Sequence, residues 1–107
     1  MARTPADILG LVATIISDRG EHHGDYVENM DNIADLWSSF IGLRLTGSQA
    51  AVMLALVKVS RMHCGGKEGF DIDDYEDAVG YLAIAAAVAE TEKEPTGGPD
   101  GKLRVLR

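Results

Sequence analysis

The sequence has 107 residues, of which 46% are hydrophobic and 25% charged, and its formal net charge is −7. A chain of this size forms one domain with a modest core, and its unbroken apolar runs, such as Ala50 to Val57, are far too short to span a bilayer. An acidic domain without a basic stripe is a poor candidate for binding duplex DNA, because phosphate neutralisation dominates that affinity. We therefore expect neither a membrane nor a duplex nucleic acid as partner.

The sequence also indicates a compartment. Its single cysteine, Cys64, excludes an internal disulfide, and the N-terminus has no basic-then-apolar leader with a small-residue cleavage site. Both features fit a reducing environment. The expected location is the cytoplasm.

The first helix is predicted to begin at Thr4, which can cap it, with Pro5 at the first helical position and Asp7 three residues after the cap. Apolar residues then recur at helical spacing up to about Asp18. The glycines and polar residues of 19–25 predict a loop.

The second helix is predicted from about Tyr26 to Ile41, where Gly42 ends it. The third follows a capping box formed by Thr46 and Gln49 and extends to about His63. Because this third helix is apolar almost all round, we expect it to be the central and most buried element.

The fourth helix is predicted from a cap at Asp71 to about Ala89, with Asp74 at the reciprocal capping position. Residues 91–107 have the composition of a flexible tail, whereas 1–90 form the helical domain. The expected fold is all-α, a four-helix bundle. Its apolar helices present more surface than so small a domain can cover, so we expect a homodimer or homotetramer.

Asp74 and Asp77 are three residues apart and share the face of the fourth helix that continues through Tyr81, Ile84 and Val88. Carboxylates at the start of a buried stripe need a cation, because burying an unpaired charge is costly. One interpretation is that Asp74 and Asp77 bind a metal ion. The other is helix capping combined with an internal salt bridge.

The third helix offers two cations, Lys58 and Arg61, on a face that they share with apolar residues. Their long side chains can extend to the surface or pair directly with Asp74 and Asp77. In a third interpretation they bind phosphate, with Arg61 as a planar fork and Lys58 as a point charge. Spacing alone does not separate these possibilities.

The second helix has three further acids, Glu28, Asp31 and Asp35. Helical-wheel placement puts Asp35 on the solvated surface, whereas Glu28 and Asp31 stand at the helix start, where they are candidate ligands. Oxygen ligands of this kind suit Mg²⁺ or Mn²⁺ rather than zinc. The spacing of the histidines and Cys64 matches no closed zinc module, so we do not expect a zinc site.

Taken together, these residues resemble a known superfamily. The segment Asp74-x-x-Asp77-Ala-Val-Gly is similar to the E-x-x-D helix of the MazG-like, all-α nucleoside triphosphate pyrophosphohydrolases. Over about residues 8–89, the pattern His23-Gly-Asp-Tyr-Val-Glu28, Lys58-Val-Ser-Arg61 and Asp74-x-x-Asp77 is similar to a family of small phage and prophage proteins. Membership would place the chain in the host cytoplasm. Some phage members, the MazZ enzymes, cleave (d)GTP.

The resemblance implies hydrolysis of a nucleoside triphosphate, possible substrates including (d)GTP, to a monophosphate and pyrophosphate. Mg²⁺ or Mn²⁺ held by carboxylates would neutralise phosphate charge and generate the attacking hydroxide. Lys58 and Arg61 would stabilise charge that develops on the phosphate oxygens. Base recognition would fall to groups such as His23, Asn29 or Asn32.

The chain departs from the superfamily pattern in one respect. MazG-like enzymes usually have E-x-x-E on the helix before E-x-x-D, where this chain has Lys58 and Arg61. If the chemistry is retained, Glu28 and Asp31 must complete the metal site. The alternatives are a phage-type protein that sequesters a nucleotide without cleaving it, and an acidic protein that docks a host partner.

Overall fold

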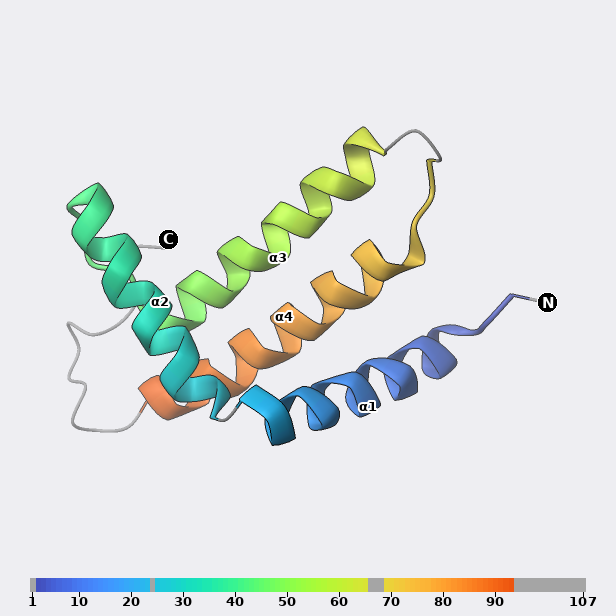
Figure 1. The fold of residues 1–107 in the computed structure, drawn as a ribbon, viewed down its shortest axis with the longest axis horizontal. Helices are drawn as coiled ribbons and strands as arrows, with labels where there is room; N and C mark the ends of the chain where they lie inside the picture. The colour runs from blue at the N-terminus through green and yellow to red at the C-terminus, as the bar shows by residue number, and fades with distance from the viewer. Residues whose placement is uncertain (1, 24, 66–68, 94–107) are drawn as a thin grey trace.

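The computed structural model describes residues 2–23, 25–65 and 69–93, with the side chains of 21–23 outside the description. It is an all-α bundle of four helices, and the described residues contain no strand. The helices are α1 (Pro5–His23), α2 (Tyr26–Ile41), α3 (Gly47–Cys64) and α4 (Ile72–Glu92) (Figure 1). None of these helices is long and apolar enough to cross a membrane. The predicted fold class is confirmed.

Side-chain caps set the starts of α1 and α3, as the sequence predicts. At α1, the Thr4 amide donates to the Asp7 carboxylate (3.0 Å), and the Asp7 amide donates to the Thr4 hydroxyl oxygen (3.1 Å). At α3, Thr46 and Gln49 form the same reciprocal arrangement. Each box satisfies amides that have no partner inside the helix.

The first helix is longer than predicted. α1 continues to His23 instead of ending near Asp18, and the predicted loop shrinks accordingly. Gly20 costs a helix interior only about 1 kcal/mol relative to alanine, and the exposed surface around it tolerates polar residues. Arg19 therefore belongs to α1 and not to a loop.

The central helix is α4, which packs against each of the other three helices. Figure 1 shows α3 and α4 side by side as an antiparallel pair, with α1 along the other side of α4 and in the same direction as α4. Small buried side chains allow α3 and α4 to approach closely, among them Ala51 and Ala55 of α3 and Ala78 and Ala85 of α4.

The expectation that α3 is the most buried helix is wrong. Its main neighbours are α2 and α4, so one side of α3 stays open. Large apolar side chains are exposed there, namely Met53, Leu56, Val57 and Val59. An apolar sequence on all sides therefore does not mean that α3 is covered on all sides by its own chain.

The last helix extends beyond the predicted domain boundary at residue 90, because Thr91 and Glu92 are helical. The Glu92 carboxylate accepts hydrogen bonds from the Ser48 amide (3.0 Å) and the Ser48 hydroxyl (2.6 Å). It thereby caps the first turn of α3 from another helix. The rest of the predicted tail, residues 94–107, lies outside the described residues.

Truncation should separate the tail from this cap. Removing residues 94–107 is expected to leave the melting temperature unchanged, as the tail composition predicts. Ending the chain at Glu90 is expected to lower the free energy of unfolding by about 1 kcal/mol, because the Glu92–Ser48 contacts are lost. Thermal unfolding of the two truncations measures the difference. A large drop for the first truncation would show that the tail docks on the bundle.

Candidate functional site

A cavity of about 280 Å³ lies between α1, α2 and α4. Its volume is close to the lower end of the range for small-molecule pockets, and its wall is mostly apolar. The lining residues are Val12, Ile15, Ile16, Arg19 and Gly20 of α1; Tyr26, Asn29, Met30 and Ile33 of α2; Leu54 of α3; and Glu76, Asp77, Gly80, Tyr81 and Ile84 of α4.

Side chains of α1 lie close to α4 at Gly80. A Cβ atom at this buried glycine would be 3.6 Å from Val12 Cγ1 and 4.0 Å from Ile16 Cδ1. The apolar face of α1 thus lies directly over the stripe of α4 that contains Asp77 and Tyr81. Three residues of the predicted stripe line the cavity, namely Asp77, Tyr81 and Ile84, whereas Asp74 and Val88 do not.

Two ion pairs join α3 to the first turns of α4. Lys58 Nζ lies 3.2 Å from an Asp77 carboxylate oxygen, and both side chains are about a quarter exposed (24% and 27%). Arg61 Nε donates to Asp74 Oδ1 at 2.9 Å. The Asp74 side chain is 10% exposed and the Arg61 side chain 60%. Of the interpretations of Lys58 and Arg61, direct pairing is what the structure contains.

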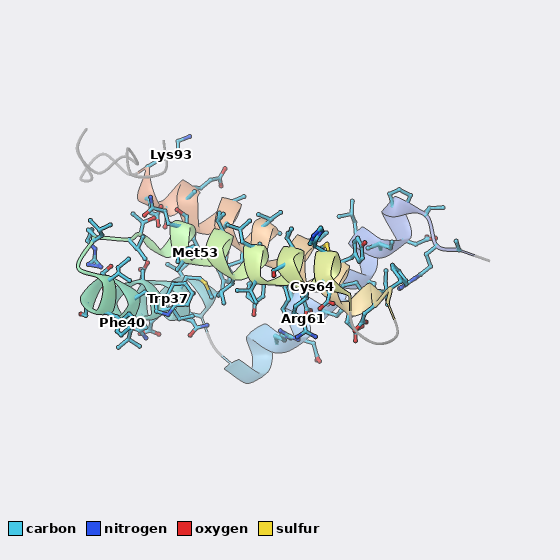
Figure 2. The ribbon with its side chains drawn as sticks, turned by 90° about the horizontal axis from the view of Figure 1, so that it is seen from above. Trp37, Phe40, Met53, Arg61, Cys64 and Lys93 are labelled. Atoms are coloured by element: carbon cyan, nitrogen blue, oxygen red, sulfur yellow. The ribbon has the colours of Figure 1, made fainter. Side chains whose placement is uncertain are left out.

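The negative field of the α4 start holds Arg61 firmly in its charged form. The pKa of Arg61 is raised, first by its hydrogen bond to Asp74 and then by the charge of Asp74, with smaller effects of Asp71 and Asp77. Asp71 caps α4 by accepting from the Asp73 amide at 3.0 Å. The Asp74 carboxylate accepts from Arg61 instead of from the start of its own helix. The predicted reciprocal cap of Asp71 and Asp74 therefore does not form. Figure 2 places Arg61 at the C-terminal end of α3.

The predicted carboxylates of α2 lie elsewhere. Glu28 is exposed, and Asp31 lies against Gly47 at the start of α3. The pKa of Asp31 is raised, first because its carboxylate is partly desolvated there and then by the charge of Glu92. Roughly 20 Å of helix separate Gly47 from Arg61, at about 1.5 Å per residue.

The structure therefore does not bring the four predicted metal ligands into one group. Among the described side chains, those of residues 2–20, 25–65 and 69–93, no three His, Cys, Asp or Glu groups come together to hold one metal ion. Asp74 and Asp77 remain together on α4, next to the two cations of α3.

The predicted base-recognition residues are separated as well. Asn29 lines the cavity. Asn32 is exposed and does not line it, and the side chain of His23 lies outside the described residues. Asp35 is on the solvated surface, as predicted, where Arg44 approaches it at 2.7 Å.

Comparison with known proteins assigns the chain to a family. Residues 7–89 match the family described as Domain of unknown function (DUF6378). The chain belongs to this family. It is 31% identical over 86 residues to the Gene 55 protein of Mycobacterium phage L5. That match covers 78% of this chain and 53% of the phage protein, so the chain spans about half the length of this relative. No solved structure matches the chain.

These matches confirm the predicted relation to phage proteins. The match to residues 7–89 includes α2, α3, most of α1 and α4, and every residue that lines the cavity. The cavity and the Lys58–Asp77 and Arg61–Asp74 pairs thus lie wholly within the matched segment.

Two charged residues of the cavity, Glu76 and Arg19, are not among the candidates that the sequence predicts. Glu76 is buried and pairs with Arg3 at 3.2 Å. Its position in the sequence, four residues before Gly80, indicates that the two residues share one face of the helix. Arg19 continues the helical series of Val12 and Ile16, but the prediction of a loop from residue 19 obscured it. Arg19 lines the cavity, and among the described side chains no carboxylate lies within ion-pair distance of it.

The two carboxylates on α4 match one common way in which proteins bind Mg²⁺. This ion is usually bound through one or two carboxylates together with substrate phosphates and water, rather than by a cage made wholly of protein groups. Asp74 and Asp77 supply two carboxylates on one helix face. They therefore suit an ion that arrives with a phosphorylated ligand.

Proposed function

We propose that this chain is a MazG-like, Mg²⁺-dependent nucleoside triphosphate pyrophosphohydrolase that acts in the host cytoplasm. The observation that supports the proposal is the position of Asp77. This residue lines a ligand-sized apolar cavity and also pairs with Lys58, a cation suited to phosphate. A mostly apolar cavity with Asp77 and its partner Lys58 at its border suits a ligand with a flat organic body and a charged phosphate chain.

In this proposal the cavity receives the nucleoside. Tyr26 and Tyr81 line the cavity, and their rings would stack on the base. Arg19 and the Asn29 amide offer hydrogen-bond donors for its edge. A cavity of about 280 Å³ leaves the phosphate chain outside, at the border formed by Asp77 and its partner Lys58.

The phosphates would then meet the charged side chains of α3 and α4. Asp74 and Asp77 would hold Mg²⁺ together with the phosphate oxygens. When bound, the ion would neutralise phosphate charge and lower the pKa of the attacking water. Lys58 and Arg61 would stabilise negative charge on the phosphate oxygens while the bond between the α- and β-phosphates breaks. The products are a nucleoside monophosphate and pyrophosphate.

A panel of ribonucleoside and deoxyribonucleoside triphosphates, (d)GTP included, tests the proposal directly. Each is incubated with the protein and Mg²⁺ or Mn²⁺, and the products are separated by ion-exchange chromatography. Monophosphate and pyrophosphate in equal amounts support the proposal, and they should disappear when a chelator is added. Release of orthophosphate with a diphosphate would indicate cleavage at a different bond. No product from any member of the panel would contradict a hydrolase.

A specific observation also favours the alternative of nucleotide sequestration. Asp74 and Asp77 are already neutralised by Arg61 and Lys58, and among the described side chains no third acid joins them in a metal-binding group. A sequestering protein would bind a nucleotide in the cavity and release it unchanged. Calorimetric binding without any product in the chromatogram identifies this case.

We also propose that the bundle self-associates through its open apolar surface. The exposed side chains Met53, Leu56 and Val57 lie on α3, and Leu82 of α4 is half exposed. Covering such side chains is the usual reason for association of small helical domains. Sedimentation at micromolar concentration is expected to give a dimer or tetramer. A stable monomer would contradict this part of the proposal, and Leu56→Glu is expected to produce that monomer from an associated wild type.

A further inference from the structure

Both carboxylates that suit a metal ion are already occupied by cations from the neighbouring helix. Asp77 is paired with Lys58 at 3.2 Å, and Asp74 is paired with Arg61 at 2.9 Å. A divalent ion that arrives alone must displace these cations and then remain close to them, which like charges oppose. A carboxylate pair in this state is a poor site for a free metal ion.

A phosphorylated ligand changes this balance because it offers the cations a new partner. Lysine and arginine are the side chains that bind phosphate best, and arginine does so with two parallel hydrogen bonds. Arg61 donates to Asp74 through Nε alone, and within the described residues its terminal nitrogens make no hydrogen bond. Its side chain is also 60% exposed, so its guanidinium is accessible from solvent.

The charges balance in such an exchange. Lys58 and Arg61 together supply two positive charges to Asp74 and Asp77, and one Mg²⁺ ion supplies the same two. The released lysine and arginine can then pair with negative phosphate oxygens. Lys58 is attached to its helix by a flexible four-carbon stem and can turn without movement of α3.

We propose, building on the proposed function, that the Lys58–Asp77 and Arg61–Asp74 pairs exchange partners when metal and polyphosphate bind together. The cations move to phosphate and the carboxylates to the metal ion. Each ligand therefore removes the obstacle to the other, and the affinities for metal and polyphosphate rise together. By thermodynamic linkage the two affinities rise by the same factor.

The test measures binding rather than turnover. Mn²⁺ binding to the full chain is followed by electron paramagnetic resonance, with and without inorganic tripolyphosphate, which needs no base recognition. Tripolyphosphate binding is followed by calorimetry with and without Mn²⁺, after correction for direct binding of Mn²⁺ to tripolyphosphate. We expect each ligand to tighten the other about 5- to 150-fold, the usual range of coupling between sites.

Two variants isolate the pairs. Lys58→Met is expected to bind Mn²⁺ alone more tightly than the wild type, to bind tripolyphosphate more weakly, and to show a smaller coupling factor. Arg61→Gln serves as a second variant should Lys58→Met fold poorly, and circular dichroism verifies the fold of both. The matched control is Arg44→Met, which removes the exposed pair between Arg44, in the segment after α2, and Asp35 of α2, and should change none of these values.

A coupling factor of one in the wild type, or an unchanged Mn²⁺ affinity in folded Lys58→Met and Arg61→Gln, would overturn the exchange. Neither result would contradict hydrolysis itself, which the chromatographic assay measures separately. Conversely, coupled binding of Mn²⁺ and tripolyphosphate without any hydrolysis would support the exchange and would favour nucleotide sequestration over hydrolysis as the function. The two proposals can therefore fail independently.

Discussion

Replacing Asp77 by asparagine is expected to lower Mg²⁺-dependent pyrophosphate release at least about a hundredfold. Asparagine keeps the size of the side chain but removes the charge that would bind the metal ion. A catalytic metal contributes several kcal/mol to stabilisation of the transition state, and each 1.4 kcal/mol or so corresponds to a factor of ten in rate. The matched control is Asp35→Asn, whose acid lies in an exposed pair on α2 and should leave turnover unchanged.

The stability of Asp77→Asn tests a second aspect of the same site. Asp77 and Lys58 are each about a quarter exposed, so the lysine left behind can extend to water. We expect a cost of about 1 kcal/mol in the free energy of unfolding without metal, as for pairs near the surface. A cost of about 3–5 kcal/mol, the value for a broken buried pair, would indicate that Asp77 has a structural role only. Full turnover in the folded variant would equally remove Asp77 from the proposed site.

Local sequence signals predicted the helices well because most of them act over three or four residues. The capping box of Thr46 and Gln49 and the left-handed Gly42, with φ of 80°, set their boundaries without help from the rest of the fold. The end of α1 was missed for a related reason. Gly20 is itself exposed, where a glycine costs a helix little, so a glycine in the sequence does not by itself mark a loop.

The partners of the charged residues could be predicted only as alternatives, because they depend on which helices are neighbours. The face that Asp74 and Asp77 share follows from helical spacing alone. Their pairing with Arg61 and Lys58 requires α3 and α4 to lie side by side. Likewise, Glu76 meets Arg3 because α1 and α4 run in the same direction, which no local pattern specifies.

The placement of Asp31 illustrates the same limit. The resemblance to MazG-like enzymes makes Asp31, with Glu28, a candidate to complete the metal site, since the third helix lacks the usual acid pair. In the fold, Asp31 instead lies against Gly47, at the far end of α3 from Arg61. Glu92 reaches the same helix start from the end of α4. This junction holds three helices together and lies away from the proposed chemistry.

Gly47→Ala is expected to destabilise the protein strongly for a change of one methyl group. Gly47 is buried, and an added Cβ would overlap the carboxylate of Asp31. The Asp31 side chain can rotate, but the same Cβ would lie 3.3 Å from Val88 Cγ1 and 3.4 Å from the Asp31 backbone nitrogen. Val88 is fully buried and has no room to move. Overpacking of this kind costs about 1–3 kcal/mol.

Gly10→Ala is the matched control and should have the opposite sign. Gly10 lies inside α1, and nothing would come within 4 Å of its added Cβ. Alanine there is expected to raise the free energy of unfolding by about 0.5–1 kcal/mol, because glycine loses more conformational freedom in a helix. Thermal and urea unfolding of both variants measure the two signs. If Gly47→Ala is also stabilised, then α2, α3 and α4 do not meet as closely at Gly47 as the structure shows. Tripolyphosphate affinity measured well below the melting temperature should be the same in both variants, since Lys58 and Arg61 lie at the other end of α3.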